Sequence, residues 1–125
     1  MNLPEIPPMD AAALLRRYGL RPDKRLGQNF LQDPEALRAI THAAGIHPDD
    51  TVLEIGSGLG SLTRYIAAAA REVVAVELDA GLLAPLRSVL KPFTNVRIVE
   101  GDILKLPPAA LVNEPGFVVV ANIPY

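Results

Sequence analysis

Cysteine is absent from this chain of 125 residues, and histidine is nearly as scarce. Without cysteine there can be no disulfide bond, no thiolate metal site and no cysteine nucleophile. The two histidines, His42 and His47, fall on or beside one predicted helix. We therefore expect no zinc site and no metal in the chemistry.

Long apolar runs are missing as well. No stretch approaches the roughly 18 residues needed to cross a bilayer. The first five residues have neither the basic start nor the apolar core of a secretion signal. We therefore expect a cytoplasmic protein without membrane contact. A content of 50% hydrophobic and 21% charged residues is ordinary for one globular domain and argues against disorder.

A large excess of charge of one sign is missing too, because 12 Lys and Arg against 14 Asp and Glu leave a formal net charge of -2. This balance argues against a protein that wraps nucleic acid over its whole surface. Positive charge is nevertheless concentrated at Arg16, Arg17, Arg21, Lys24 and Arg25. Such a stretch is either a solvated helix end and loop or a surface that contacts phosphates.

Helical signals occupy the first third of the chain. Three prolines within the first nine residues predict an extended or loose tail there. A helix is expected to begin after Asp10, a good N-cap, and to end at Gly19. A second helix is expected after Asp33 and should stop at Gly45. The residues expected on one face of this second helix are Leu37, Ile40 and Ala44.

From residue 52 the pattern changes to short apolar runs separated by helical stretches. The predicted buried strands are 52–55, 73–76, 96–99 and 117–121. Segments 61–70 and 80–90 are long enough for crossover helices, and a shorter segment lies around 108–111. This alternation predicts an α/β fold with a parallel sheet and right-handed crossovers. Pro85 lies inside the second crossover segment and predicts a kink or a late helix start there.

A glycine-rich loop follows the first predicted strand. Gly56, Gly58 and Gly60 would let the backbone turn tightly and let a ligand approach main-chain N–H groups at a helix N-terminus. Ser61 stands where the dinucleotide fingerprint has its third glycine, which weakens the case for a nicotinamide or flavin cofactor. Glu77 closes the second strand, where a carboxylate can accept ribose hydroxyls. The simpler alternatives are a tight connection and an exposed strand-end acid.

Two further acids lie near the same predicted edge of the sheet. Asp102 follows the third strand, where its carboxylate could accept the amino group of an adenine or merely cap a turn. Glu54 lies inside the first strand, where a charge is costly unless it is paired or placed at a ligand. Glu54 could either hold the glycine loop in place or contact a ligand directly, and the sequence favours neither role. Asp79 is expected to cap the next helix.

The motif Asn122-Ile123-Pro124-Tyr125 follows the last apolar run, at the edge where open α/β sheets place their chemistry. Together with 26–31, 52–63, 76–79 and 101–102, it resembles the ribosomal RNA adenine N6,N6-dimethyltransferase family. The resemblance is greatest to the small-subunit branch, and it covers the chain from about residue 20 to its end.

The resemblance implies a Rossmann-like S-adenosylmethionine-dependent methyltransferase fold. In that fold a partial parallel sheet has strand order 3-2-1-4, with helices on both faces. Residues 1–25 would be an N-terminal tail and basic helix, and residues 26–125 the first part of the catalytic domain. The fourth strand would then lack an outer partner. We therefore expect a truncated piece of a longer enzyme, lacking the rest of the catalytic domain and a C-terminal helical domain, with impaired activity.

The resemblance also implies S-adenosylmethionine as cofactor. Asn29 and Leu31 would contact it and close over it, and the loop beginning at Gly56 would receive its methionine part. Glu77 would take the ribose hydroxyls and Asp102 the adenine amine. The full set of cofactor-binding positions implied is Gln28, Asn29, Leu31, Glu54, Gly56, Gly58, Gly60, Glu77, Asp102 and Asn122.

The same resemblance assigns the last four residues to the target adenosine. Its amino group is a weak nucleophile, so two acceptors must align it: the Asn122 side-chain oxygen and the Ile123 carbonyl. Pro124 keeps Ile123 extended. Tyr125 would stack on the base, a contact worth roughly 1–3 kcal/mol. Positioning and a preorganised polar site would do most of the work, without a metal.

The expected function is N6-dimethylation of adenosines in small-subunit ribosomal RNA during ribosome maturation. The partner would be that RNA or a pre-ribosomal particle. One alternative is the branch that methylates large-subunit RNA and confers antibiotic resistance. A nucleotide-dependent oxidoreductase shares the strand, loop and acid, but offers no reason for residues 122–125. A non-catalytic RNA- or ribosome-binding fragment is a third possibility, through residues 16–25.

Overall fold

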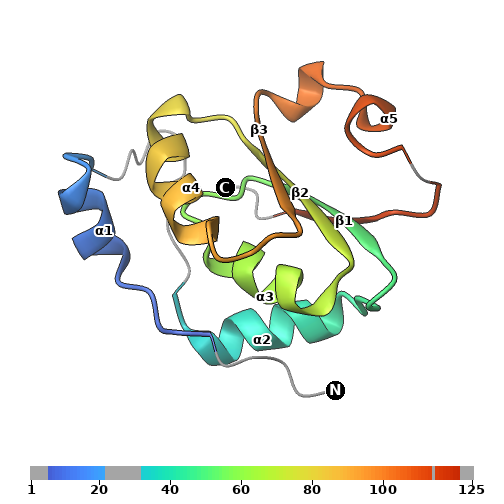
Figure 1. The fold of residues 1–125 in the computed structure, drawn as a ribbon, viewed down its shortest axis with the longest axis horizontal. Helices are drawn as coiled ribbons and strands as arrows, with labels where there is room; N and C mark the ends of the chain where they lie inside the picture. Colours follow the sequence, from blue (N-terminus) through green and yellow to red (C-terminus); the bar gives the residue numbers. More distant parts are fainter. Residues whose placement is uncertain (1–5, 22–31, 114, 122–125) are drawn as a thin grey trace.

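The computed structural model describes residues 6–21, 32–113 and 115–121, and these form a parallel four-stranded sheet with helices on both faces (Figure 1). The strands are β1 (Thr51–Ile55), β2 (Glu72–Glu77), β3 (Val96–Glu100) and β4 (Val118–Ala121). Their order in the sheet is β3-β2-β1-β4, and every pairing is parallel. The predicted fold and strand order are therefore confirmed. Within the described part of the chain, β4 pairs only with β1.

The helices begin and end close to their sequence signals. They are α1 (Ala11–Arg17), α2 (Pro34–Ala43), α3 (Ser61–Ala69), α4 (Leu83–Leu90) and α5 (Pro108–Leu111), with 3-10 turns η2 (Ala80–Leu82) and η3 (Ile103–Lys105). The Asp10 carboxylate accepts the Ala13 N–H at 3.0 Å, and the Asp33 carboxylate accepts the Glu35 N–H at 3.1 Å. Each bond satisfies a backbone donor that has no acceptor inside its helix, so both predicted N-caps are confirmed.

Pro85 produces the late start rather than the kink. The chain first forms η2, and α4 begins at Leu83, so Pro85 is the third residue of the α-helix. In this first turn a backbone N–H would have no intrahelical acceptor, and its absence costs nothing.

The face of α2 that carries Leu37, Ile40 and Ala44 is only partly buried. Ile40 is 37% exposed, whereas Leu37 and Thr41 are the buried residues of this helix. The Thr41 hydroxyl donates to the Leu37 carbonyl at 2.8 Å, so this polar side chain can be buried without an unsatisfied group.

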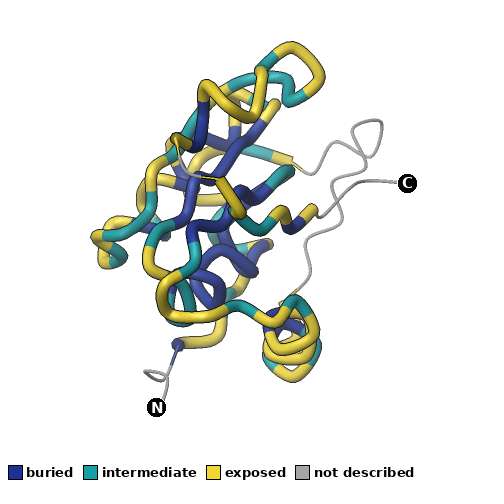
Figure 2. Tube along the Cα trace, turned by 90° about the vertical axis from the view of Figure 1, so that its right-hand side faces the viewer, coloured by how far each residue is buried: buried dark blue, intermediate teal, exposed yellow. Residues whose placement is uncertain are grey.

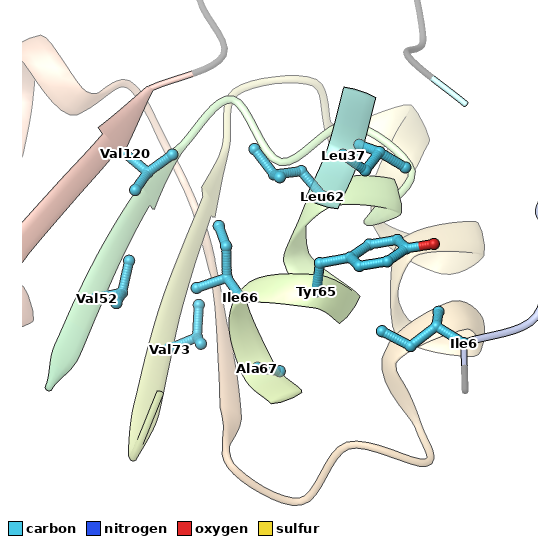
Figure 3. Packing of buried hydrophobic residues seen from close by; sticks show 9 residues of the cluster. All are labelled: Ile6, Leu37, Val52, Leu62, Tyr65, Ile66, Ala67, Val73 and Val120. Atoms are coloured by element: carbon cyan, nitrogen blue, oxygen red, sulfur yellow. The ribbon is translucent and has the colours of Figure 1, made fainter. Parts of the chain in front are cut away.

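The sheet has a hydrophobic core on each face. Alternate residues of β1 face opposite ways: Val52 packs with α2 and α3, and Leu53 packs with α5 (Figure 3 shows the first core). Ile6 also belongs to the first core, so the chain is already packed at its first described residue, while residues 1–5 of the predicted tail lie outside the described residues. Figure 2 shows that buried positions follow the central strands, while exposed positions follow the outer loops and helix faces. No helix among the described residues is long and apolar enough to span a membrane.

Candidate functional site: the carboxyl edge of the sheet

The strand register brings three predicted site segments to one edge of the sheet. Ile55 of β1 pairs with Val76 of β2, and Val76 pairs with Val99 of β3. The glycine loop, Glu77 and Asp102 therefore emerge from neighbouring strands on the same side. A backbone hydrogen bond joins the glycine loop to the end of β2: the Gly56 N–H donates to the Val76 carbonyl at 2.9 Å.

The glycine loop has backbone conformations that other residues rarely adopt. The φ angles are 78° at Gly56, 60° at Gly58 and 83° at Gly60, all in the left-handed region. A Cβ on Gly60 would also lie 3.0 Å from Leu86 Cδ1 and 3.2 Å from Leu90 Cδ2 of α4. Glycine is thus required at position 60 both by the turn and by the close packing of α4.

The Glu77 carboxylate is tied to the glycine loop. Its Oε1 accepts the Gly58 N–H at 2.6 Å, and its Oε2 accepts the Asp79 N–H at 2.8 Å. The side chain is 7% exposed, so it is not an exposed strand-end acid. Since a carboxylate has about four acceptor positions, these two bonds leave capacity for the hydroxyl groups of a ligand.

Glu54 belongs to β1, and its side chain contacts α3, the helix that follows the glycine loop. It is 1% exposed, its Oε1 accepts the Thr63 hydroxyl, and its Oε2 has no hydrogen-bond partner among the described residues. Burial raises the pKa of Glu54 to about 7, against the opposing effect of the nearby Thr63 and Ser57 hydroxyl groups. The negative charge of Glu77 adds to the increase in this pKa. Glu54 is therefore only partly ionised near neutral pH.

The two aspartates at this edge cap turns. The Asp79 carboxylate accepts the Gly81 N–H at 2.9 Å, which confirms its predicted capping of the segment that leads into α4. The Asp102 carboxylate accepts the Leu104 N–H at 2.9 Å and caps η3. Asp102 is half-buried, and one capping bond leaves acceptor capacity on its carboxylate.

Several predicted site residues lie outside the described residues: Gln28, Asn29, Leu31, Asn122, Ile123, Pro124 and Tyr125. The last described residue of β4, Ala121, pairs with Ile55. The end of β4 is therefore level with the start of the glycine loop.

Two contacts at this edge were not predicted from the sequence. Thr63, in the first turn of α3, is fully buried against Glu54. Leu59, between two glycines, is 1% exposed and packs with Leu15 of α1 and Leu82 of η2. A large apolar residue inside a glycine loop is the signal that could have predicted this docking of α1.

Among the described residues, no group of three His, Asp or Glu side chains could hold a metal ion.

A sequence model of the family described as "Ribosomal RNA adenine dimethylase" matches residues 19–125 of the chain. The chain belongs to this family. It is 42% identical over 123 residues to the ribosomal RNA small subunit methyltransferase A of Leuconostoc mesenteroides, covering 94% of this chain and 42% of that protein. It is 47% identical over 122 residues to the protein of the same name from Moorella thermoacetica, covering 90% of this chain and 42% of that protein.

Among solved structures, the 23S rRNA methyltransferase ErmE is similar, with a TM-score of 0.69 and 39% identity. That match covers 78% of this chain and 38% of ErmE. This member of the rRNA adenine dimethylase family therefore spans about two-fifths of the length of the two curated relatives. The resemblance on which the sequence predictions rested is confirmed.

Proposed function

We propose that the chain forms the S-adenosylmethionine-binding part of an enzyme that dimethylates N6 of adenosines in small-subunit ribosomal RNA. Family membership supports this proposal, as do the small-subunit relatives at 42% and 47% identity. The observation that carries it is the bond from Gly58 to Glu77, which fixes a glycine loop beside a buried strand-end carboxylate. Ribosome maturation in the cytoplasm is part of the same proposal.

The polar groups at the carboxyl edge fit this cofactor. S-adenosylmethionine supplies an activated methyl group on a positively charged sulfur, and its ribose and adenine carry hydroxyl and amino donors. The described edge offers the acceptors Glu77 and Asp102, with acceptor positions left after their backbone bonds. Glu77 would take the ribose hydroxyls and Asp102 the adenine amine. The loop from Gly56 to Gly60 would receive the methionine part.

The residues outside the described ranges complete the proposed site. Asn29 and Leu31 would contact the cofactor and close over it, and Gln28 would also bind it. Asn122 and the Ile123 carbonyl would accept hydrogen bonds from the target amine and hold its lone pair towards the methyl group. Pro124 would restrict Ile123, and Tyr125 would stack on the adenine. These roles need positioning and exclusion of water rather than an acidic nucleophile.

Large-subunit RNA is the second candidate substrate, because the 23S rRNA methyltransferase ErmE is 39% identical to this chain. The curated small-subunit relatives are 42% and 47% identical to the chain, and this supports the small subunit. Transfer of a labelled methyl group to purified small-subunit or large-subunit RNA distinguishes the two candidates.

Calorimetry tests the cofactor proposal directly. We expect the chain to bind S-adenosylmethionine and not NAD, and we expect Glu77→Ala to weaken the binding at least tenfold. Glu72→Ala is the matched control, since Glu72 begins the same strand at the opposite edge of the sheet. Binding of NAD in place of S-adenosylmethionine, or an equal loss in both variants, would contradict the proposal.

A further inference from the structure

The helix α1 and the turn after it have one apolar side and one basic side. Ala11 and Leu15 are buried, whereas Arg16, Arg17 and Arg21 are exposed. The apolar side therefore attaches the segment to the rest of the molecule, and the three guanidinium groups face solvent. Lys24 and Arg25, the other cations of this stretch, lie outside the described residues.

The apolar side is docked on the candidate site. Leu15 packs with Leu59 of the glycine loop and Leu82 of η2, and Leu20 packs against the same cluster. Figure 1 shows α1 beside the start of α4, on the side of the molecule where η2 leads into that helix. The Leu20 N–H donates to the Leu15 carbonyl at 2.8 Å across the turn that Gly19 makes with φ 67°. The polypeptide that carries the arginines is thus anchored before and after Arg16 and Arg17.

The three arginines are not neutralised by carboxylates in the described part of the chain. None of them forms an ion pair with an acidic residue there. The adjoining site is rich in carboxyl groups, since Glu77 and Asp102 lie at its edge. Such a site suits a cationic cofactor but repels a polyanion, so an RNA substrate needs a separate positive surface close to it.

We propose that Arg16, Arg17 and Arg21 form a surface that binds backbone phosphates of the RNA substrate and holds the strand beside the glycine loop. Guanidinium groups match phosphate geometry through paired N–H donors. The contacts would orient the RNA without reading its bases, leaving base recognition to the site. This inference rests on the proposed function, because it assumes an RNA substrate.

The test is the salt dependence of RNA binding. Fluorescence anisotropy with a labelled small-subunit RNA hairpin would be measured from 50 to 300 mM salt for the chain and for the triple variant Arg16→Gln, Arg17→Gln, Arg21→Gln. Each lost phosphate contact lowers the slope of log K against log salt by about 0.7 for unpaired RNA, or about 2 for three contacts. This difference in slope corresponds to roughly 50-fold weaker RNA binding by the triple variant at 0.15 M salt.

The control is Arg87→Gln with Lys91→Gln, which removes two exposed cations at the end of α4. We expect the control to keep the slope, and S-adenosylmethionine affinity to be the same in all three proteins. If the triple variant unfolds, Arg16→Gln and Arg17→Gln are measured singly, each with an expected decrease of about 0.7 in the slope.

Several outcomes would overturn the inference: no RNA binding by the unmodified chain, an unchanged slope in the arginine variants, or an equal loss in the control. Arginine-dependent binding to phosphatidylserine vesicles without RNA binding would contradict it too. Failure of the proposed function is separate, because it appears as absent S-adenosylmethionine binding in the unmodified chain.

Discussion

Glu54 should make the chain less stable as the pH rises through neutrality. It is 1% exposed, and only one of its oxygens has a hydrogen-bond partner in the described structure. In the unfolded chain water solvates this carboxylate, so it ionises near its ordinary pKa of 4.5, whereas in the folded chain burial raises the pKa to about 7. The folded state therefore binds a proton that the unfolded state has already released.

The size of the effect follows from these two pKa values. A pKa difference of one unit is a tenfold difference in proton affinity, which equals roughly 1.4 kcal/mol of free energy. The change from 4.5 to about 7 then corresponds to a loss of about 3 kcal/mol in the free energy of unfolding. The favourable contribution of protonated Glu54 is fully present below pH 4.5, decreases as the pH rises, and is lost above about 7.

Glu54→Gln removes this titration and keeps the shape of the side chain. The amide oxygen can still accept the Thr63 hydroxyl, and the amide nitrogen replaces the oxygen that has no partner. We expect the variant to lack the Glu54 contribution to the pH dependence. At pH 8 it should exceed the unmodified chain in stability by a margin approaching 3 kcal/mol, reduced by the cost of burying the amide donors.

Urea unfolding at half-unit steps from pH 4.5 to 8.5 measures this difference. Glu100→Gln is the control, because Glu100 ends β3 with an exposed side chain. If Glu54→Gln and the unmodified chain lose stability in parallel between pH 5 and 8, Glu54 is ionised throughout and the reasoning is refuted.

Three other substitutions test the packing around the site by urea unfolding. Gly60→Ala should cost about 1–3 kcal/mol, because its φ is 83° and the new Cβ would press on Leu86; an unchanged midpoint would contradict this. Leu59→Ala should lower the free energy of unfolding by about 2–5 kcal/mol and make the amide hydrogens of α1 exchange faster. Equal exchange rates in α1 of both proteins would disprove this. Tyr65→Phe removes a buried hydroxyl without a partner in the described structure, so stability should stay constant or rise by up to about 1 kcal/mol. A large loss would reveal a partner for that hydroxyl.

Short-range signals predicted most of the elements. The caps Asp10 and Asp33 act on backbone donors two or three residues away, so the residues nearby suffice to predict them. The strands were predictable because short β-branched runs between helical stretches belong in a buried parallel sheet. Pro85 marked the start of α4 because its effect on the backbone is local. The family resemblance supplied the strand order, which such local patterns do not contain.

Only the tertiary structure decided which side chains meet. The bond between Gly58 and Glu77 joins residues 19 positions apart, and its formation depends on the register of β1 against β2. Burial of Glu54 beside Thr63 depends on where α3 packs on the sheet. The docking of α1 on Leu59 depends on contacts between distant segments. The amino-acid sequence by itself thus determined the elements, the family and the candidate residues, because these follow from local preferences and motifs. The tertiary structure determined how the charges are paired and buried, because those interactions exist only after the strands have aligned and the helices have packed.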